Sequence, residues 1–133
     1  MLHEIVGLAD EPPARRRWFH DDYFDLFVWQ SLNGEVVQFQ LCYGIASSER
    51  ALVWQRQGGF FHDGHPADRP EPLANVMARF EDAAPTLPKM IRQSVGSRLY
   101  EFEKQASAVP VRRREFRRAS WQKRLTYSAG RAG

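Results

Sequence analysis

The sequence holds one cysteine, Cys42, and no apolar run longer than four residues. A single cysteine excludes a disulfide within the chain and is typical of proteins in reducing compartments. Runs of four residues are far shorter than the roughly 20 apolar residues that a membrane-spanning helix needs. The first residues, from Met1 to Ile5, lack the basic start and the apolar stretch of a secretory signal. We therefore expect a cytoplasmic protein without membrane insertion.

Sequence motifs of common catalytic sites are also absent. The chain has no glycine-rich phosphate loop, no GxSxG turn, no HExxH motif and no CxxC pair. We therefore assign no catalytic residue and expect no cofactor. With 43% hydrophobic and 26% charged residues, the 133-residue chain has the composition of one globular domain rather than of a disordered chain.

The net charge of +3 conceals two parts of opposite sign. Residues 1–106 hold 11 Lys and Arg against 15 Asp and Glu, which gives a charge of −4. Residues 107–133 hold eight basic residues against one acidic residue, which gives +7. This division predicts a single domain over residues 1–106 and a basic, flexible tail over residues 107–133. Such asymmetry also indicates an anionic partner.

The strongest structural signal is a β-hairpin centred on Asn33-Gly34. Apolar residues alternate with other residues over 24–30, and a second arm covers Val36–Tyr43. Asn-Gly favours a two-residue turn in which both residues have positive φ. The register that such a turn imposes pairs apolar residues on one face, namely Val28 with Phe39, Leu26 with Leu41 and Phe24 with Tyr43. The other face pairs Phe27 with Gln40 and Trp29 with Gln38.

The rest of residues 1–106 predicts one or two more strands and then two helices. A third strand is expected over residues 49–57, and Phe60-Phe61 could add a fourth. Apolar residues at helical spacing predict a helix from Leu73 that Pro85 ends, and a second helix, with Thr86 as its N-cap, that reaches Ala106. The expected fold is α+β, an antiparallel β-meander followed by two α-helices and the basic tail. Residues 1–17 show no clear pattern beyond a short strand or helical turn.

The basic tail interleaves cationic and aromatic side chains. Guanidinium groups pair with phosphates and aromatic rings stack on unpaired bases, so the tail could bind nucleic acid with an affinity that falls with salt. It could instead dock on an acidic protein partner or on the acidic body of this chain, or stay solvated without a partner. The candidate contact residues are Arg112, Arg113, Arg114, Phe116, Arg117, Arg118, Trp121, Lys123 and Arg124.

A second candidate binding surface is the hairpin face that carries Phe27, Trp29 and Val36. If exposed, these side chains would form an apolar patch that binds a protein partner or a second copy of the chain. If residues 1–17 or Phe60-Phe61 cover them, they are ordinary core. Cys42 shares this face, where a lone cysteine is most often a small buried side chain.

Two segments rich in His and Asp could form a metal or catalytic site if they met in space. Residues 20–22, His-Asp-Asp, precede the hairpin, and residues 62–65, His-Asp-Gly-His, follow the last expected strand. Imidazoles with a carboxylate can hold Zn²⁺ or Fe²⁺, and a His beside an Asp can act as a general base. The spacing matches no established ligand motif, and Asp22 could simply cap a local turn. The weak metal candidates are therefore His20, His62 and His65.

Several stretches of the chain resemble a family of small uncharacterised bacterial proteins. They are residues 16–19 (RRWF), 24–26 (FDL), 28–29 (VW), 39–43 (FQLCY), 50–52 (RAL) with Trp54, and 58–60 (GGF). The resemblance covers about residues 16–63 and excludes the basic tail. It implies a bacterial cytoplasmic origin, and because the family has no established activity, the resemblance assigns no catalytic residue to this chain.

Together these features predict a non-catalytic interaction or adaptor protein. It would bind a protein partner, or itself, through the sheet face, and an acidic partner surface through the tail. Two alternatives remain open at this point: a nucleic-acid-binding protein that uses the tail, and a small metal-dependent enzyme built on His and Asp.

Overall fold

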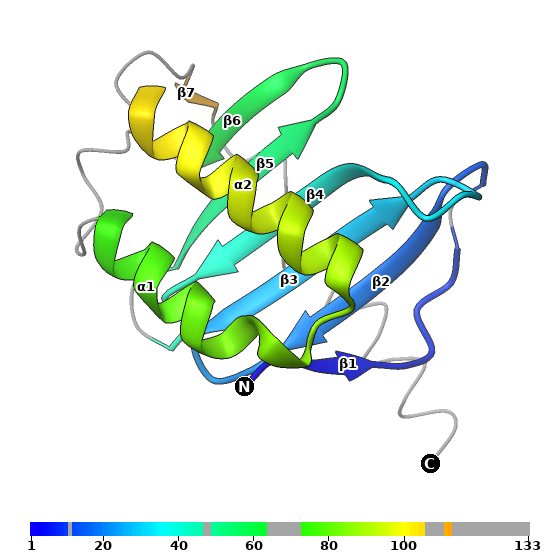
Figure 1. Cartoon of the computed structure of the whole chain (residues 1–133), viewed down its shortest axis with the longest axis horizontal. Coiled ribbons are helices and arrows are strands. Elements are labelled where there is room, and N and C mark those ends of the chain that lie inside the picture. The colour runs from blue at the N-terminus through cyan, green and yellow to red at the C-terminus, as the bar shows by residue number, and fades with distance from the viewer. Residues whose placement is uncertain (11, 47–48, 64–72, 106–110, 113–133) are drawn as a thin grey trace.

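The computed structural model describes residues 1–10, 12–46, 49–63, 73–105 and 111–112. Within these residues an antiparallel meander of six strands is followed by two α-helices on one face of the sheet (Figure 1). A short seventh strand pairs in parallel with the sixth. The strands are β1 (His3–Ile5), β2 (Arg15–His20), β3 (Phe24–Gln30), β4 (Val36–Tyr43), β5 (Arg50–Gln55), β6 (Gly59–Asp63) and β7 (Val111–Arg112). The α+β architecture expected from the sequence is confirmed.

The helices follow the expected order, with one correction at Thr86. Helix α1 covers Leu73–Ala83, the 3₁₀ turn η2 covers Ala84–Thr86, and α2 covers Lys89–Gln105. The hydroxyl of Thr86 donates a hydrogen bond to the Leu2 carbonyl, so this side chain joins the N-terminal strand region to η2 and does not cap α2. None of the helices described is both long and apolar enough to span a bilayer.

The β3–β4 hairpin has the register that the sequence predicts, but its turn is displaced by one residue. Gly34 N–H donates to the Ser31 carbonyl at 2.9 Å, and Ser31 N–H donates to the Glu35 carbonyl at 2.8 Å. The turn therefore has Leu32 and Asn33 at its centre, and Gly34 follows them with a φ of +89°. A type I turn followed by a glycine with positive φ is the usual form of a three-residue hairpin loop.

The displaced turn moves one predicted surface residue to the other face. The register shifts between Trp29 and Gln30, so that Gln30 pairs with Val36. Val36 therefore packs in the cluster beneath the helices, and its predicted place beside Phe27 and Trp29 is wrong. A shift of one residue reverses the direction of a strand side chain because the side-chain period of a strand is two.

The sheet is buried on both faces. On the helix side, Phe39, Leu41, Val76, Ile91 and Phe102 belong to one large apolar cluster and have an exposed fraction of zero, like Leu26, Val28 and Val95. On the other side, Trp18, Phe27, Trp29, Cys42 and Ala51 form a second cluster, against which Ile5, Leu8, Ala14, Val37 and Ile45 pack. Phe27 and Trp29 are thus core side chains. Of the two alternatives that the sequence left open, an exposed apolar patch or ordinary core, the structure shows core for these two residues.

A paired ionic contact joins β1 to β2. Arg17 Nε and Nη2 donate to the two carboxylate oxygens of Glu4 at 2.8 and 2.7 Å. These hydrogen bonds hold the pKa of Glu4 below its ordinary value of 4.5, although partial burial opposes them. Because the pKa of Glu4 is lower in the folded state, the contact stabilises the fold above the ordinary Glu pKa. That contribution is lost as the pH falls through the folded-state pKa.

The Glu4→Gln variant tests this contact. At pH 7 it should lower the free energy of unfolding by less than about 1 kcal/mol, since both side chains are partly exposed. Below the folded-state pKa of Glu4 the difference from the wild type should vanish. Urea unfolding at pH 7 and pH 3 measures this decline, and the loss should be smaller at pH 3, where more of Glu4 is protonated. Glu103→Gln on the exposed face of α2 is the control. A loss of equal size at both pH values would contradict this account.

Candidate functional site

A groove of about 840 Å³ opens at one end of the sheet. Three connections border it: the β1–β2 connection at Pro13 and Ala14, the β3–β4 turn, and the β5–β6 turn at residues 56–58. A volume of this size lies within the range of about 300–1,000 Å³ that is typical of ligand-binding sites.

The floor of the groove follows from the irregular start of β4. Val37, the extra residue of the β3–β4 register shift, accepts a hydrogen bond from Arg56 N–H at 3.0 Å. This bond draws the end of β5 against the start of β4. Gln38 and Gln55 are cross-strand partners there, and both line the groove. The β5–β6 turn is tight, because Gly58 N–H donates to the Gln55 carbonyl and Gly59 has a φ of +77°.

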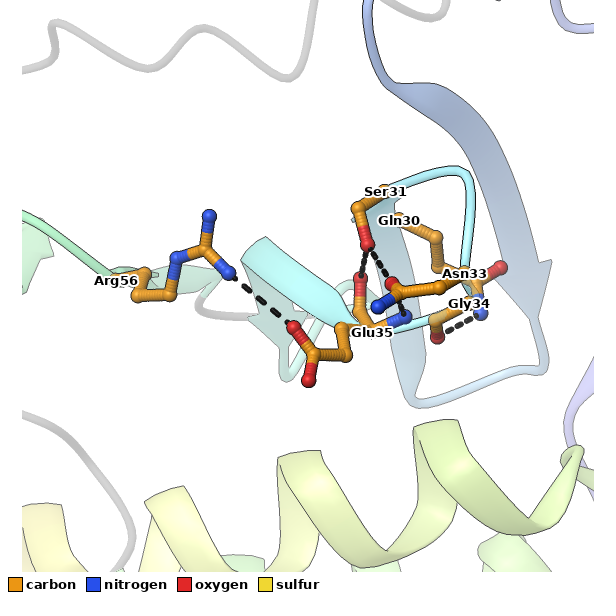
Figure 2. A network of polar contacts seen from close by, with 6 residues as sticks. All are labelled: Gln30, Ser31, Asn33, Gly34, Glu35 and Arg56. Atoms are coloured by element: carbon orange, nitrogen blue, oxygen red, sulfur yellow. Dashed lines mark hydrogen bonds and ion pairs between the residues drawn. The ribbon is translucent and has the colours of Figure 1, made fainter.

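A network of polar contacts fixes the β3–β4 turn at the rim of the groove (Figure 2). Gln30 Nε2 donates to the Gly34 carbonyl at 2.9 Å. Asn33 Oδ1 accepts hydrogen bonds from the Ser31 hydroxyl and, at 3.3 Å, from Glu35 N–H. Both hydrogen bonds join the Asn33 side chain to other residues of the same turn, so Asn33 stabilises the shape of the rim.

The charges that line the groove cancel. Arg56 Nη1 lies 3.4 Å from Glu35 Oε2 across the rim (Figure 2). About half of each of these two side chains is exposed. Among the lining residues that the structure describes, these two are the charged ones. The groove therefore has no net charge to attract a phosphate or another strongly charged ligand.

The uncharged lining offers both hydrogen-bonding groups and apolar contact. The side-chain amides of Gln38, Gln55 and Gln57 make no hydrogen bond within the described part of the chain, so their donors and acceptors are available to a ligand. Beside them Leu32 stands at the tip of the turn with 89% of its surface exposed.

A second polar constellation lies at the opposite end of the strands, on the same face as Trp18 and Phe27. The carboxylate of Asp25 is fully buried, and its Oδ1 accepts a hydrogen bond from Trp18 Nε1 at 2.6 Å. The same oxygen lies 2.7 Å from Nδ1 of His20, whose side chain is one-third exposed. His20 thus has a buried carboxylate as its partner.

The His and Asp segments singled out in the sequence do not meet. His62 lies under the helices, where its Nε2 is 2.7 Å from the Tyr43 hydroxyl and its ring stacks on Phe102, whereas His20 belongs to the other face. His65 lies outside the described residues. A metal site that combines His20 with His62 is therefore excluded by the fold.

The turn between β2 and β3 uses a different aspartate from the one expected. Asp21 Oδ1 accepts hydrogen bonds from the N–H groups of Tyr23 and Phe24 at 2.8 and 2.7 Å. Asp22, the suggested cap, is exposed.

The candidate residues of the tail fall mostly outside the described part of the chain. Of them, Arg112 is placed by its backbone, which pairs with Asp63 at the edge of the sheet. The others, Arg113, Arg114, Phe116, Arg117, Arg118, Trp121, Lys123 and Arg124, are not among the described residues.

Comparison with known proteins adds no relative: no family model matches the chain, and neither a curated protein nor a solved structure matches it. The proposed function therefore rests on the side chains that line the groove.

Proposed function

We propose that this protein is a peptide-binding interaction module whose groove holds an uncharged, extended segment of a partner protein. The observation that carries the proposal is the set of glutamine amides in the groove, which make no hydrogen bond within the described residues, beside the exposed Leu32. The protein acts as an adaptor, without a catalytic step of its own.

Amide side chains suit an extended peptide because each carries two N–H donors and a carbonyl acceptor. A peptide backbone offers the same two kinds of group at every residue. Gln38 and Gln55, which face each other across β4 and β5, can therefore pair with successive backbone groups of one segment. Leu32 and Val37 supply the apolar contact for a side chain of that segment.

The charge of the groove favours a peptide over a nucleic acid. Binding of nucleic acids depends on cationic side chains that replace counterions at the phosphates. Arg56 is the cation among the described lining residues, and Glu35 already neutralises it. In this proposal the basic tail makes a separate contact with an acidic surface of the same partner, which its charge of +7 supports. The single thiol, Cys42, is buried and forms no disulfide, as suits a cytoplasmic adaptor.

Selection from a random library of displayed peptides tests the proposal with the full-length protein. We expect the wild type to enrich uncharged segments that share an apolar residue. Leu32→Asp should weaken the binding of the selected peptide at least about tenfold, which corresponds to about 1.4 kcal/mol. Tyr100→Ser, which alters an exposed side chain on α2, should change the dissociation constant less than about twofold.

A second variant alters the amides without changing the apolar contact. A Cβ atom at Gly58 would lie 2.7 Å from Oε1 of Gln55, so Gly58→Ala forces this flexible side chain to move. We expect weaker peptide binding with an unchanged melting temperature. If no peptide is enriched, or if the enriched peptides bind both variants as tightly as the wild type, the groove is not the binding site.

A further inference from the structure

His3 and His20 face each other across the first two strands, at the far end of the sheet from the groove. They are directly opposite in the β1–β2 register. Their ring centres lie 5.7 Å apart and the ring planes are nearly perpendicular, at 87°. Because opposite residues of an antiparallel pair project to the same face, the two imidazoles approach one another from neighbouring strands.

This separation fits a metal ion held between the two rings. Zinc binds imidazole nitrogen at about 2.0–2.1 Å, which places the metal about 3.2 Å from each ring centre. Two such rings around one tetrahedral ion have centres about 5–6 Å apart. The observed distance of 5.7 Å lies within that interval.

Asp25 orients the His20 ring for metal binding. Its buried carboxylate contacts Nδ1 of His20 at 2.7 Å, so it holds the proton on that nitrogen. Nε2 is therefore the ring nitrogen that can bind a metal ion, and within the described residues it has no hydrogen-bond partner. A carboxylate that orients a histidine through its second nitrogen is a regular feature of metal sites. Trp18 Nε1 donates a hydrogen bond to the same carboxylate oxygen at 2.6 Å and so helps to fix its position.

We propose that His3 and His20 bind a divalent transition-metal ion, with Asp25 as the residue that positions His20. Imidazole ligands favour Zn²⁺, Cu²⁺ and Ni²⁺ over Mg²⁺ and Ca²⁺. Among the residues that the structure describes, no three or more His, Cys, Asp and Glu side chains lie close enough together to hold a metal ion. In this proposal the two imidazoles are therefore the protein ligands, and water molecules complete the coordination of the ion. The site is independent of the peptide groove.

Calorimetric titration of Zn²⁺ into the full-length protein, free of any histidine tag, tests this inference. We expect one site, and at least about tenfold weaker binding in both His3→Asn and His20→Asn. Asp25→Asn keeps both ligands and should weaken binding about 10–100-fold. Glu103→Gln, on the exposed face of α2, serves as the control, with affinity expected to equal that of the wild type.

Because His3 is exposed, its replacement should leave the fold intact, so a loss of binding in His3→Asn reports on the metal ligand itself. Imidazole NMR signals provide a second readout, since Zn²⁺ should shift those of His3 and His20 and leave that of His62 in place. If no Zn²⁺ binds, or if His3→Asn and His20→Asn bind it as tightly as the wild type, the proposal is wrong.

Discussion

The Phe102→Ala variant is expected to lower the free energy of unfolding by about 3–5 kcal/mol. Phe102 lies on α2 with an exposed fraction of zero. Its ring stacks on the imidazole of His62 at 5.7 Å and also contacts the ring of Phe60 at 5.6 Å. Truncation would therefore leave a cavity between α2 and β6 and remove the aromatic neighbour of a buried histidine.

Thermal unfolding measures this effect, and a loss of this size should lower the melting temperature by roughly 10–20 °C. Tyr100→Ala is the matched control, because Tyr100 lies on the same helix but is 54% exposed. Its contact with Lys104 contributes less than about 1 kcal/mol. If both variants lost the same stability, α2 would not pack on the sheet as the structure shows.

The Asp25→Ala variant should lower the free energy of unfolding by about 1–3 kcal/mol. It removes the acceptor of Trp18 Nε1, and Trp18 is only 9% exposed. A buried donor without an acceptor loses its hydrogen bond to water without gaining another. Asp25→Asn retains a carbonyl acceptor at this position and should cost less.

Asp22→Ala is the control for this pair, since Asp22 is exposed in the preceding turn and should change stability by less than about 0.5 kcal/mol. Urea unfolding of the three variants gives the comparison. Equal stabilities of Asp25→Ala and Asp22→Ala would show that the Asp25 carboxylate is not the buried partner of Trp18.

The hairpin was predictable because its alternation continues over both arms and aligns apolar residues across the strands. The predicted turn, with Asn33 and Gly34 at its centre, was wrong. Asn-Gly fits a two-residue loop and also the last two positions of a three-residue loop, and the sequence does not distinguish them. That difference of one residue decides the face on which Val36 lies. Strand β2 was missed because it begins with three arginines and is buried only toward its end, at Trp18 and Phe19.

The candidate sites were less predictable than the fold. In the sequence His20 stands next to Asp21 and Asp22, whereas in the structure its carboxylate partner is Asp25, inside β3. A signal for Asp25 was present, because a charged residue within an otherwise apolar strand needs a partner when it is buried. His3 becomes a neighbour of His20 only through the β1–β2 register. The groove depends on three connections that meet in space, and no local pattern encodes such a meeting.

The most direct test of the proposed function is an NMR titration of the full-length protein with a peptide selected by the wild type. Binding in the groove predicts that the largest amide shifts fall on residues 31–38 and 55–58, which border it. Amides at the other end of the sheet, around His20 and Asp25, should move little. Shifts confined to that other end, or to the exposed face of α2, would contradict the proposal that the groove binds peptides.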